Sequence, residues 1–250
     1  MKLELKKLSK KFEMPKSGFF NWILGDAVQV EALKSIDLEI KEKEVIGVIG
    51  RNGSGKTTLL RIIAGIYKPT IGEIEKDARI AYIDGFRKGL KPQLSVGENI
   101  NSFGLLLGKS PAEIKQKYES ILKLSGLERF EKAKLENFTP GMISRLNFAI
   151  ASSFIEYEKV NIILLDEIFS NGIDAEFKER AIEKIKEMKK HNLAIIIVSH
   201  DLKIITELCN KAILIDNGEI ISQGRPSKVI LDYENKIETN GTIKKVLHDE

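Results

Sequence analysis

The residues with the clearest chemical implication form a glycine-rich run, Gly50-Arg51-Asn52-Gly53-Ser54-Gly55-Lys56-Thr57, which matches the pattern G-x-x-x-x-G-K-[ST] in full. Glycines let the backbone wrap around phosphate groups, so that successive N–H groups and the start of the next helix face the negative charge. Lys56 supplies a mobile positive charge for the β- and γ-phosphates, and the Thr57 hydroxyl is a ligand for Mg²⁺. The run therefore predicts a nucleotide site.

Two carboxylates and a histidine follow two other apolar runs. Asp166 and Glu167 come directly after the run 162–165, and His200 follows the run 194–198. Ligands of open α/β sheets bind at the carboxyl ends of the parallel strands. We therefore expect Asp166 to hold Mg²⁺ and Glu167 to act as the general base on the attacking water. His200 could bond the γ-phosphate, although a lone histidine at a strand end is more often structural.

These side chains require strands that end at a common edge. The short, continuous apolar runs at 45–49, 162–165 and 194–198 alternate with helical patterns, which favours parallel strands covered on both faces. Alternating apolar residues at 3–8 and 36–40 predict a half-exposed antiparallel region ahead of that core.

The middle of the chain, from about residue 97 to residue 157, has helical patterns. Ser110, Pro111 and Glu113 form a capping box at one helix start, and Gly126 suits its end. Later in the chain, Asn217-Gly218 between two apolar runs predicts a tight hairpin. The expected fold is α/β, with a P-loop core of mostly parallel sheet, an antiparallel β region and a helical subdomain.

Length and composition exclude several other classes of protein. The chain has 250 residues, 40 basic and 36 acidic side chains, a formal charge of +4 and a single cysteine, Cys209. That charge is too small to argue for nucleic acid as a partner, and one cysteine excludes internal disulfides. The apolar runs are far shorter than the ~20 residues of a membrane span, and the N-terminus lacks the apolar region of a secretory signal. A reducing cytosol fits this composition.

The order and spacing of the motifs resemble those of the nucleotide-binding (ATPase) subunit of ABC transporters. The resemblance treats residues 1–230 as one ATPase domain, with a helical subdomain at about 97–157, and leaves 231–250 as a short polar tail. It implies that ATP and Mg²⁺ are bound and that Lys56, Glu167 and His200 are catalytic. It places Phe12 against adenine, Gly50, Asn52, Gly53, Ser54, Gly55, Lys56, Thr57 and Thr58 around the phosphates, and Thr57 and Asp166 at Mg²⁺.

A second phosphate-contacting element is implied by the segment 138–142. Its residues predict a helix start, with Thr139 as N-cap before a first-turn proline. In the family this helix end contacts the γ-phosphate held by another copy, so that two ATP molecules join two chains head to tail. The resemblance gives that role to Thr139, Gly141 and Met142, and it assigns Asp174 to the nucleotide site through the loop after the acidic strand.

Two features narrow the resemblance to the exporters of O-antigen, capsule and teichoic acid chains. Pro140 and Met142 stand where the commonest signature has glycine and glutamine, as in those exporters. An aromatic insertion at about 14–26 matches an extra short helix near their membrane entry gate, although a surface helix packed on the strands would explain it as well. The family's glutamine loop has Gly85 at the glutamine position here, with Asp84 as a weak substitute.

We therefore expect an ATPase that works as a homodimer, peripheral to the cytoplasmic face of the inner membrane, and exports a lipid-linked polysaccharide through a separate integral membrane subunit. An ABC exporter of drugs, lipids or other small solutes is an alternative, opposed only by the signature and the insertion. A soluble ABC ATPase of translation or DNA repair is disfavoured by the single ATPase unit. A nucleotide-binding module without catalysis is disfavoured because Lys56, Asp166, Glu167 and His200 are all present.

Overall fold

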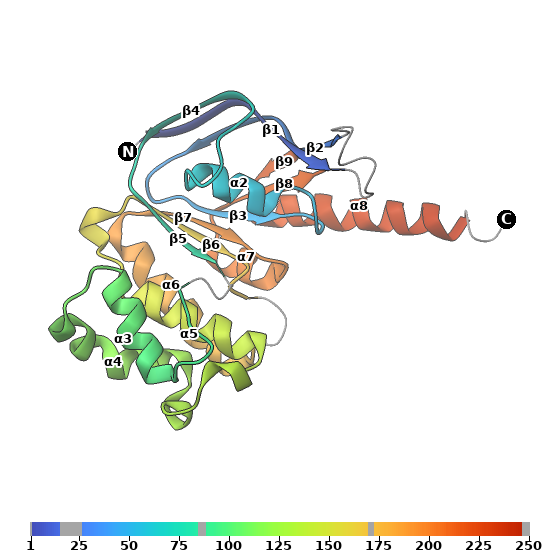
Figure 1. The fold of residues 1–250 in the computed structure, drawn as a ribbon. Coiled ribbons are helices and arrows are strands. Elements are labelled where there is room, and N and C mark those ends of the chain that lie inside the picture. Colours follow the sequence, from blue (N-terminus) through green and yellow to red (C-terminus); the bar gives the residue numbers. More distant parts are fainter. Residues whose placement is uncertain (1, 16–26, 85–88, 170–172, 247–250) are drawn as a thin grey trace. The chain divides into compact units, whose positions relative to one another are not determined.

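The computed structural model describes residues 2–15, 27–84, 89–169 and 173–246 (Figure 1). Most of the expected aromatic insertion, the glutamine-loop position Gly85 and residues 170–172 lie outside this part of the chain. The chain folds as two compact units. The first contains the residues up to Lys41, Ile46–Ala78 and the residues from Asn210, and the second contains Glu42–Val45 and Arg79–Cys209.

An antiparallel sheet forms part of the first unit. β1 (Lys2–Pro15) lies between β2 (Ala27–Ile40) and β4 (Ile71–Asp77), and Leu5 of β1 pairs with Leu38 of β2. Apolar and polar residues alternate along these strands because one face of the sheet is buried and the other is solvated. This confirms the predicted antiparallel region, whose inward residues are Leu3, Leu5, Leu8, Ile36, Leu38 and Ile40.

The phosphate loop follows a parallel strand of the first unit. β3 (Val45–Ile49) pairs in parallel with β8 (Lys211–Asp216), which turns back into the antiparallel β9 (Glu219–Gly224). Asn217 and Gly218 have φ angles of 45° and 84°, the left-handed values that a two-residue hairpin turn needs. The predicted hairpin is therefore confirmed.

Helices flank these strands within the first unit. α2 (Lys56–Ile63) begins directly after the phosphate loop, and α8 (Pro226–Val246) packs against β8 and β9 (Figure 1). Val229 of α8 is fully buried, whereas Leu231 and Ile237 are exposed. The polar sequence after Pro226 thus forms a helix that is anchored by few apolar side chains.

The second unit contains the other parallel strands. β5 (Ile80–Asp84), β6 (Ile162–Asp166) and β7 (Ala194–Val198) pair in parallel. Every residue of β6 and β7 is buried, which explains why their sequences are apolar without alternation. α6 (Ala175–Met188) and α7 (Leu202–Leu208) follow β6 and β7, respectively, so the predicted alternation of strand and helix is confirmed.

The helical segment of the second unit contains α3 (Val96–Leu106), α4 (Pro111–Ser125) and α5 (Pro140–Ser153). The predicted capping box is present, because the Ser110 hydroxyl accepts the Glu113 N–H and the Glu113 carboxylate accepts the Ser110 N–H at 2.8 Å. Short 3₁₀ turns occupy Glu128–Phe130, Leu135–Asn137, Tyr157–Lys159 and Lys189–His191. Within the described ranges, no helix has both the length and the apolar composition that crossing a membrane requires.

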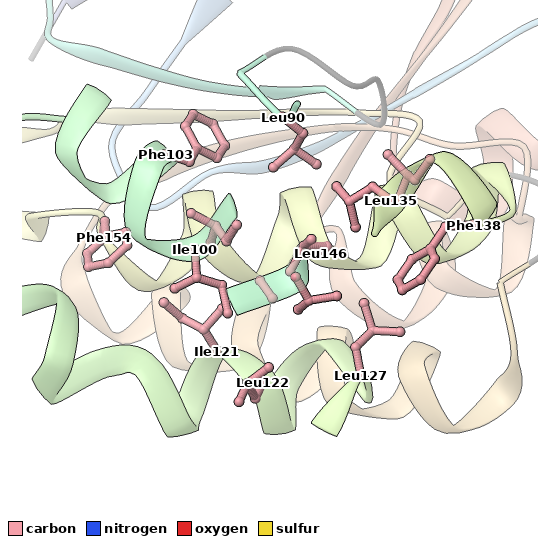
Figure 2. Close-up of a cluster of buried hydrophobic side chains, with 14 of the residues drawn as sticks. Leu90, Ile100, Phe103, Ile121, Leu122, Leu127, Leu135, Phe138, Leu146 and Phe154 are labelled. Carbon is pink, nitrogen blue, oxygen red and sulfur yellow. The ribbon is translucent and has the colours of Figure 1, made fainter. Parts of the chain in front are cut away.

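A hydrophobic cluster joins α3, α4 and α5 (Figure 2). Leu146 of α5 is fully buried in it, as are Ile100 of α3 and Ile121 of α4. The cluster fixes α5, whose N-terminus carries the segment 138–142 that the sequence singles out.

Truncation of Leu146 to alanine is expected to lower the free energy of unfolding by about 3–5 kcal/mol, because it removes buried methyl groups and leaves a cavity. Leu106→Ala is the matched control, since Leu106 of α3 is 70% exposed and its loss should change stability by less than about 0.5 kcal/mol. Urea unfolding followed by circular dichroism measures both variants. Equal stabilities would show that the cluster does not support this subdomain.

Candidate nucleotide site

The phosphate loop follows a buried strand and tolerates only glycine at two points. Gly50 and Gly55 have φ angles of 148° and 110°. A Cβ atom on Gly50 would lie 2.1 Å from the carbonyl oxygen of Ile215, and one on Gly55 would lie 2.6 Å from that of Ala32. Any side chain at either position would displace backbone, so these glycines fix the path of the loop.

Lys56 begins α2 and holds the loop closed. Its Nζ donates hydrogen bonds to the carbonyl oxygens of Gly50 at 2.9 Å and Arg51 at 2.8 Å, and its side chain is buried. No side chain caps this end of α2, because the N-cap residue is Gly55. The positive end of the helix dipole and a buried ammonium therefore lie together, which is the arrangement that binds phosphate.

A cavity of about 380 Å³ opens beside the loop. Lys236 of α8 lines it and pairs with Asp216 at 2.8 Å. The sequence analysis did not predict this pair as part of the site, because a single lysine in a polar helix forms no recognisable pattern. The other lining residues are Arg51, Asn52, Gly53, Ser54 and Asn217, so three of the predicted phosphate-binding residues border the cavity.

Phe12, the residue expected to stack on adenine, lies half-buried on β1. Its ring meets the ring of Tyr67 edge-on, with centroids 5.4 Å apart, and Lys10 Nζ lies 5.0 Å from its centroid. Aromatic edges and cations are normal neighbours of a π face. Tyr67 adds an aromatic group that the sequence analysis did not identify, and stacking on adenine stays a prediction.

In the second unit, Asp166 ends β6 and is fully buried. Its Oδ2 accepts a hydrogen bond from the Tyr82 hydroxyl of β5 at 2.7 Å. Asp84 pairs in register with Asp166 on the neighbouring strand and is also buried, and its carbonyl oxygen accepts a hydrogen bond from the Asn147 amide of α5. The strand ends thus gather two carboxylates, and a role for Asp84 in place of the family's glutamine stays a prediction.

The structure brings Glu167 and His200 together. Glu167 Oε1 lies 3.3 Å from His200 Nε2, and the Glu167 N–H donates to the carbonyl oxygen of Val198 on β7. Glu167 has a φ of 54°, a left-handed value that is uncommon for a residue other than glycine. Backbone strain of this kind concentrates at functional sites. Two of the residues predicted to be catalytic are therefore within interaction distance of each other.

Asp201 fixes the segment that follows His200. Its carboxylate caps α7 by accepting the N–H groups of Lys203 and Ile204, and it pairs with Lys178 of α6. Partial burial alone would raise the pKa of Asp201, but the Lys178 ammonium and the two backbone donors outweigh it and lower that pKa. Asp201 is therefore a charged anchor rather than a proton donor.

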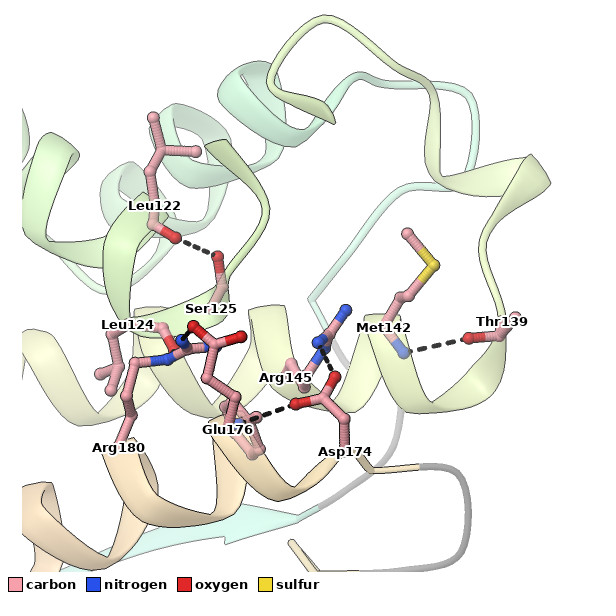
Figure 3. A network of polar contacts seen from close by, with 10 residues as sticks. Leu122, Leu124, Ser125, Thr139, Met142, Arg145, Asp174, Glu176 and Arg180 are labelled. Atoms are coloured by element: carbon pink, nitrogen blue, oxygen red, sulfur yellow. Dashed lines mark hydrogen bonds and ion pairs between the residues drawn. The ribbon is translucent and has the colours of Figure 1, made fainter. Parts of the chain in front are cut away.

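The signature segment forms the helix start that its sequence predicts. The Thr139 hydroxyl accepts the Met142 N–H at 3.3 Å at the beginning of α5 (Figure 3). Gly141 is buried, Met142 is half-buried and Thr139 is exposed. A capped, positive helix end is thus present, and its contact with a phosphate of another copy stays a prediction.

Arg145 connects this helix to Asp174, which sequence analysis identified without its partner. The Arg145 guanidinium pairs with Asp174 Oδ2, and Asp174 Oδ1 accepts the Phe177 N–H at the start of α6 (Figure 3). One carboxylate therefore caps α6 and holds α5. The pairing was not predicted, because the two residues lie on elements far apart in the sequence.

The predicted metal ligands have the chemistry of a Mg²⁺ site. Thr57 and Asp166 offer a hydroxyl and a carboxylate oxygen, the hard donors that Mg²⁺ prefers. The described residues contain no group of three or more His, Cys, Asp or Glu side chains that would bind a metal by themselves. Each donor therefore fits Mg²⁺ in its chemistry, and the binding of one Mg²⁺ ion by both residues stays a prediction.

Comparison of the sequence with known proteins gives consistent matches. A family model described as ABC transporter matches residues 33–170. The O-antigen export system ATP-binding protein RfbE of Yersinia enterocolitica is 36% identical over 80% of this chain and 81% of its own length. RfbB of Myxococcus xanthus, of the same description, is 34% identical over 89% of this chain. The teichoic acids export ATP-binding protein TagH of Lactococcus lactis is 33% identical over 95% of it. The chain spans about half the length of these last two relatives, 51% and 52%.

Solved structures give the same fold. A dimeric, post-hydrolysis structure of the ATP-binding cassette MJ0796 bound to ADP and Pi is similar with a TM-score of 0.71 and 24% identity, over 90% of this chain and 98% of that one. The structure of cbiO1 from Clostridium perfringens, part of an ABC transporter complex, is similar with a TM-score of 0.65 and 25% identity, over 98% of this chain and 97% of that one. These likenesses confirm the expected α/β fold of the P-loop class.

Proposed function

The chain belongs to the ABC transporter family, and from that premise we propose that it is the ATP-hydrolysing subunit of an exporter of cell-surface polysaccharide. The observation that carries the proposal is the contact between Glu167 and His200 in a chain whose phosphate loop is intact. A module that only binds nucleotide has no need for a strained glutamate beside a histidine.

In the proposed mechanism, three side chains carry out the hydrolysis of ATP. The Lys56 ammonium neutralises charge on the β- and γ-phosphates, and the N–H groups at the start of α2 hold them. Glu167 accepts a proton as water attacks the γ-phosphorus, and His200 holds Glu167 and the γ-phosphate in line. The bond from the γ-phosphorus to the bridging oxygen breaks, giving ADP and phosphate. Thr57 and Asp166 would hold Mg²⁺, which would supply positive charge to the phosphate oxygens.

A second copy of this chain completes the site in the proposal. The capped start of α5, with Thr139, Gly141 and Met142, faces the γ-phosphate bound by the other copy. The support is a positive helix end whose N-terminal residues include exposed Thr139 and half-buried Met142. ATP then joins the two copies head to tail, and release of phosphate separates them.

The proposed cargo is a lipid-linked polysaccharide of the O-antigen, capsule or teichoic acid type. Support comes from relatives whose names specify export of O-antigen or teichoic acids, and from the signature Thr139-Pro140-Gly141-Met142. The chain would act from the cytoplasmic face of the membrane through a separate transmembrane subunit. Two of these relatives are about twice as long as this chain. The proposed role of this chain is therefore ATP hydrolysis and not recognition of the polysaccharide.

Capture of the tagged chain from detergent-solubilised membranes of its source organism, followed by mass spectrometry, tests this function. A multi-span membrane protein in stoichiometric amount is expected, together with loss of surface polysaccharide when the gene is deleted. Normal surface polysaccharide with altered resistance to a drug or lipid would favour an exporter of small solutes. Recovery from the soluble fraction alone would favour a cytosolic ATPase.

A further inference from the structure

The carboxylate of Asp166 depends on a neighbour that no motif identifies. Asp166 has no exposed surface, and its Oδ2 accepts a hydrogen bond of 2.7 Å from the Tyr82 hydroxyl. A buried carboxylate stays charged only when hydrogen bonds or cations replace the water that it has lost. Tyr82 comes from β5, whereas Asp166 ends β6, so strand pairing creates this contact.

We propose that Tyr82 is a positioning residue for Asp166. Its O–H group donates to one carboxylate oxygen and holds it in place, so that Asp166 is correctly oriented to bind Mg²⁺ together with the nucleotide. Groups that hydrogen-bond to a metal ligand typically change metal affinity or activity about 10–100-fold when they are removed. The inference rests on the proposed function, because it assumes that Asp166 is a ligand of Mg²⁺.

The surroundings of Tyr82 make it a suitable position for a mutation. Tyr82 is only half-buried and lines a cavity of about 290 Å³ together with Leu107, Phe154 and Ile155. Phenylalanine keeps the ring and adds no atom, so Tyr82→Phe removes the hydrogen bond without overpacking. Tyr118→Phe is a matched control in the same unit, since the Tyr118 hydroxyl donates a hydrogen bond of the same length, 2.7 Å, to Glu131.

The direct test is a titration of Mn²⁺, a paramagnetic substitute for Mg²⁺, into the protein with a non-hydrolysable ATP analogue, with free Mn²⁺ followed by electron paramagnetic resonance. Tyr82→Phe is expected to weaken Mn²⁺ binding by about 10-fold or more, and Tyr118→Phe to leave it at the wild-type value. Binding of the analogue in EDTA verifies that each variant is folded. Replacement of Tyr82 by 4-aminophenylalanine places an N–H donor at the position of the hydroxyl and should recover part of the Mn²⁺ affinity. This variant also tests the inference if Tyr82→Phe does not fold.

Comparison of metal binding with nucleotide binding separates positioning from a structural role. Tyr82→Phe should lose Mn²⁺ affinity while its binding of the analogue in EDTA stays at the wild-type value. Unchanged Mn²⁺ affinity in Tyr82→Phe would overturn the inference alone. A wild-type chain that binds no Mn²⁺ with the analogue would overturn the proposed function with it.

Discussion

Replacement of Glu167 by glutamine is expected to lower steady-state ATP hydrolysis at least ~10²-fold, the contribution of a positioned general base, while ATP affinity stays close to that of the wild type. Glutamine has the same shape, and its Oε1 can still approach His200, which lies 3.3 Å from Glu167 Oε1. It cannot accept the proton of the attacking water. The phosphate loop and Lys56 are untouched, so binding and turnover should separate.

The same variant tests the proposed dimer. If ATP joins two copies and its hydrolysis separates them, a chain that binds but does not hydrolyse should accumulate as a dimer in ATP and Mg²⁺. Light scattering after gel filtration measures the mass directly. Glu183→Gln, at an exposed glutamate of α6, is the matched control and should hydrolyse ATP at the wild-type rate. A monomer under these conditions would refute the head-to-tail model, and undiminished hydrolysis would refute the assignment of Glu167 as the base.

The backbone of Glu167 is strained, and the surrounding structure must hold it in this conformation. A residue other than glycine in the left-handed region costs about 1–3 kcal/mol, and it persists only where the surrounding structure enforces it. Here the enforcing contacts are the buried strand β6 before it and the hydrogen bond from its N–H to Val198 on β7. The kink at the strand end accompanies the approach of the carboxylate to His200, so the backbone conformation and the proposed chemistry are linked.

Local patterns in the sequence predict the elements that present the site. The unbroken apolar runs predict β6 and β7 because both strands are buried on both faces, and the capping box at Ser110 predicts where α4 begins. The phosphate loop is also predicted by its residue pattern, although the backbone atoms that exclude a side chain at Gly50 and Gly55 belong to Ile215 and Ala32, which are distant in the sequence. A pattern of neighbouring residues therefore identifies each of these elements, but it does not identify the distant contacts that the loop makes.

Contacts between side chains on distant elements were not predicted. Tyr82 meets Asp166, and Lys236 meets Asp216, only because strand pairing and helix packing bring the elements together. A tyrosine in an apolar strand indicates burial, and nothing in the sequence shows which carboxylate its hydroxyl will find. Pair contacts of this kind depend on which elements become neighbours in the fold, and the local residue pattern of one element does not identify its neighbour.

The Lys56→Met variant should lose ATP binding, whereas Glu167→Gln should lose only hydrolysis. The lysine exchange removes the positive charge that binds the phosphates. Methionine keeps the length and the apolar stem, but the hydrogen bonds to Gly50 and Arg51 and the attraction to the β- and γ-phosphates are lost. A hydrogen bond to a charged group contributes about 1.5–3 kcal/mol, so ATP affinity should fall about 10–100-fold, with hydrolysis reduced at least as much. Calorimetric titration with ATP measures the affinity.

Lys76→Met is the matched control, since Lys76 Nζ also donates to a backbone carbonyl, that of Ile63, in the same unit. If Lys56→Met bound ATP as tightly as Lys76→Met, the phosphates would not lie against this loop, and the nucleotide site would have to be sought elsewhere.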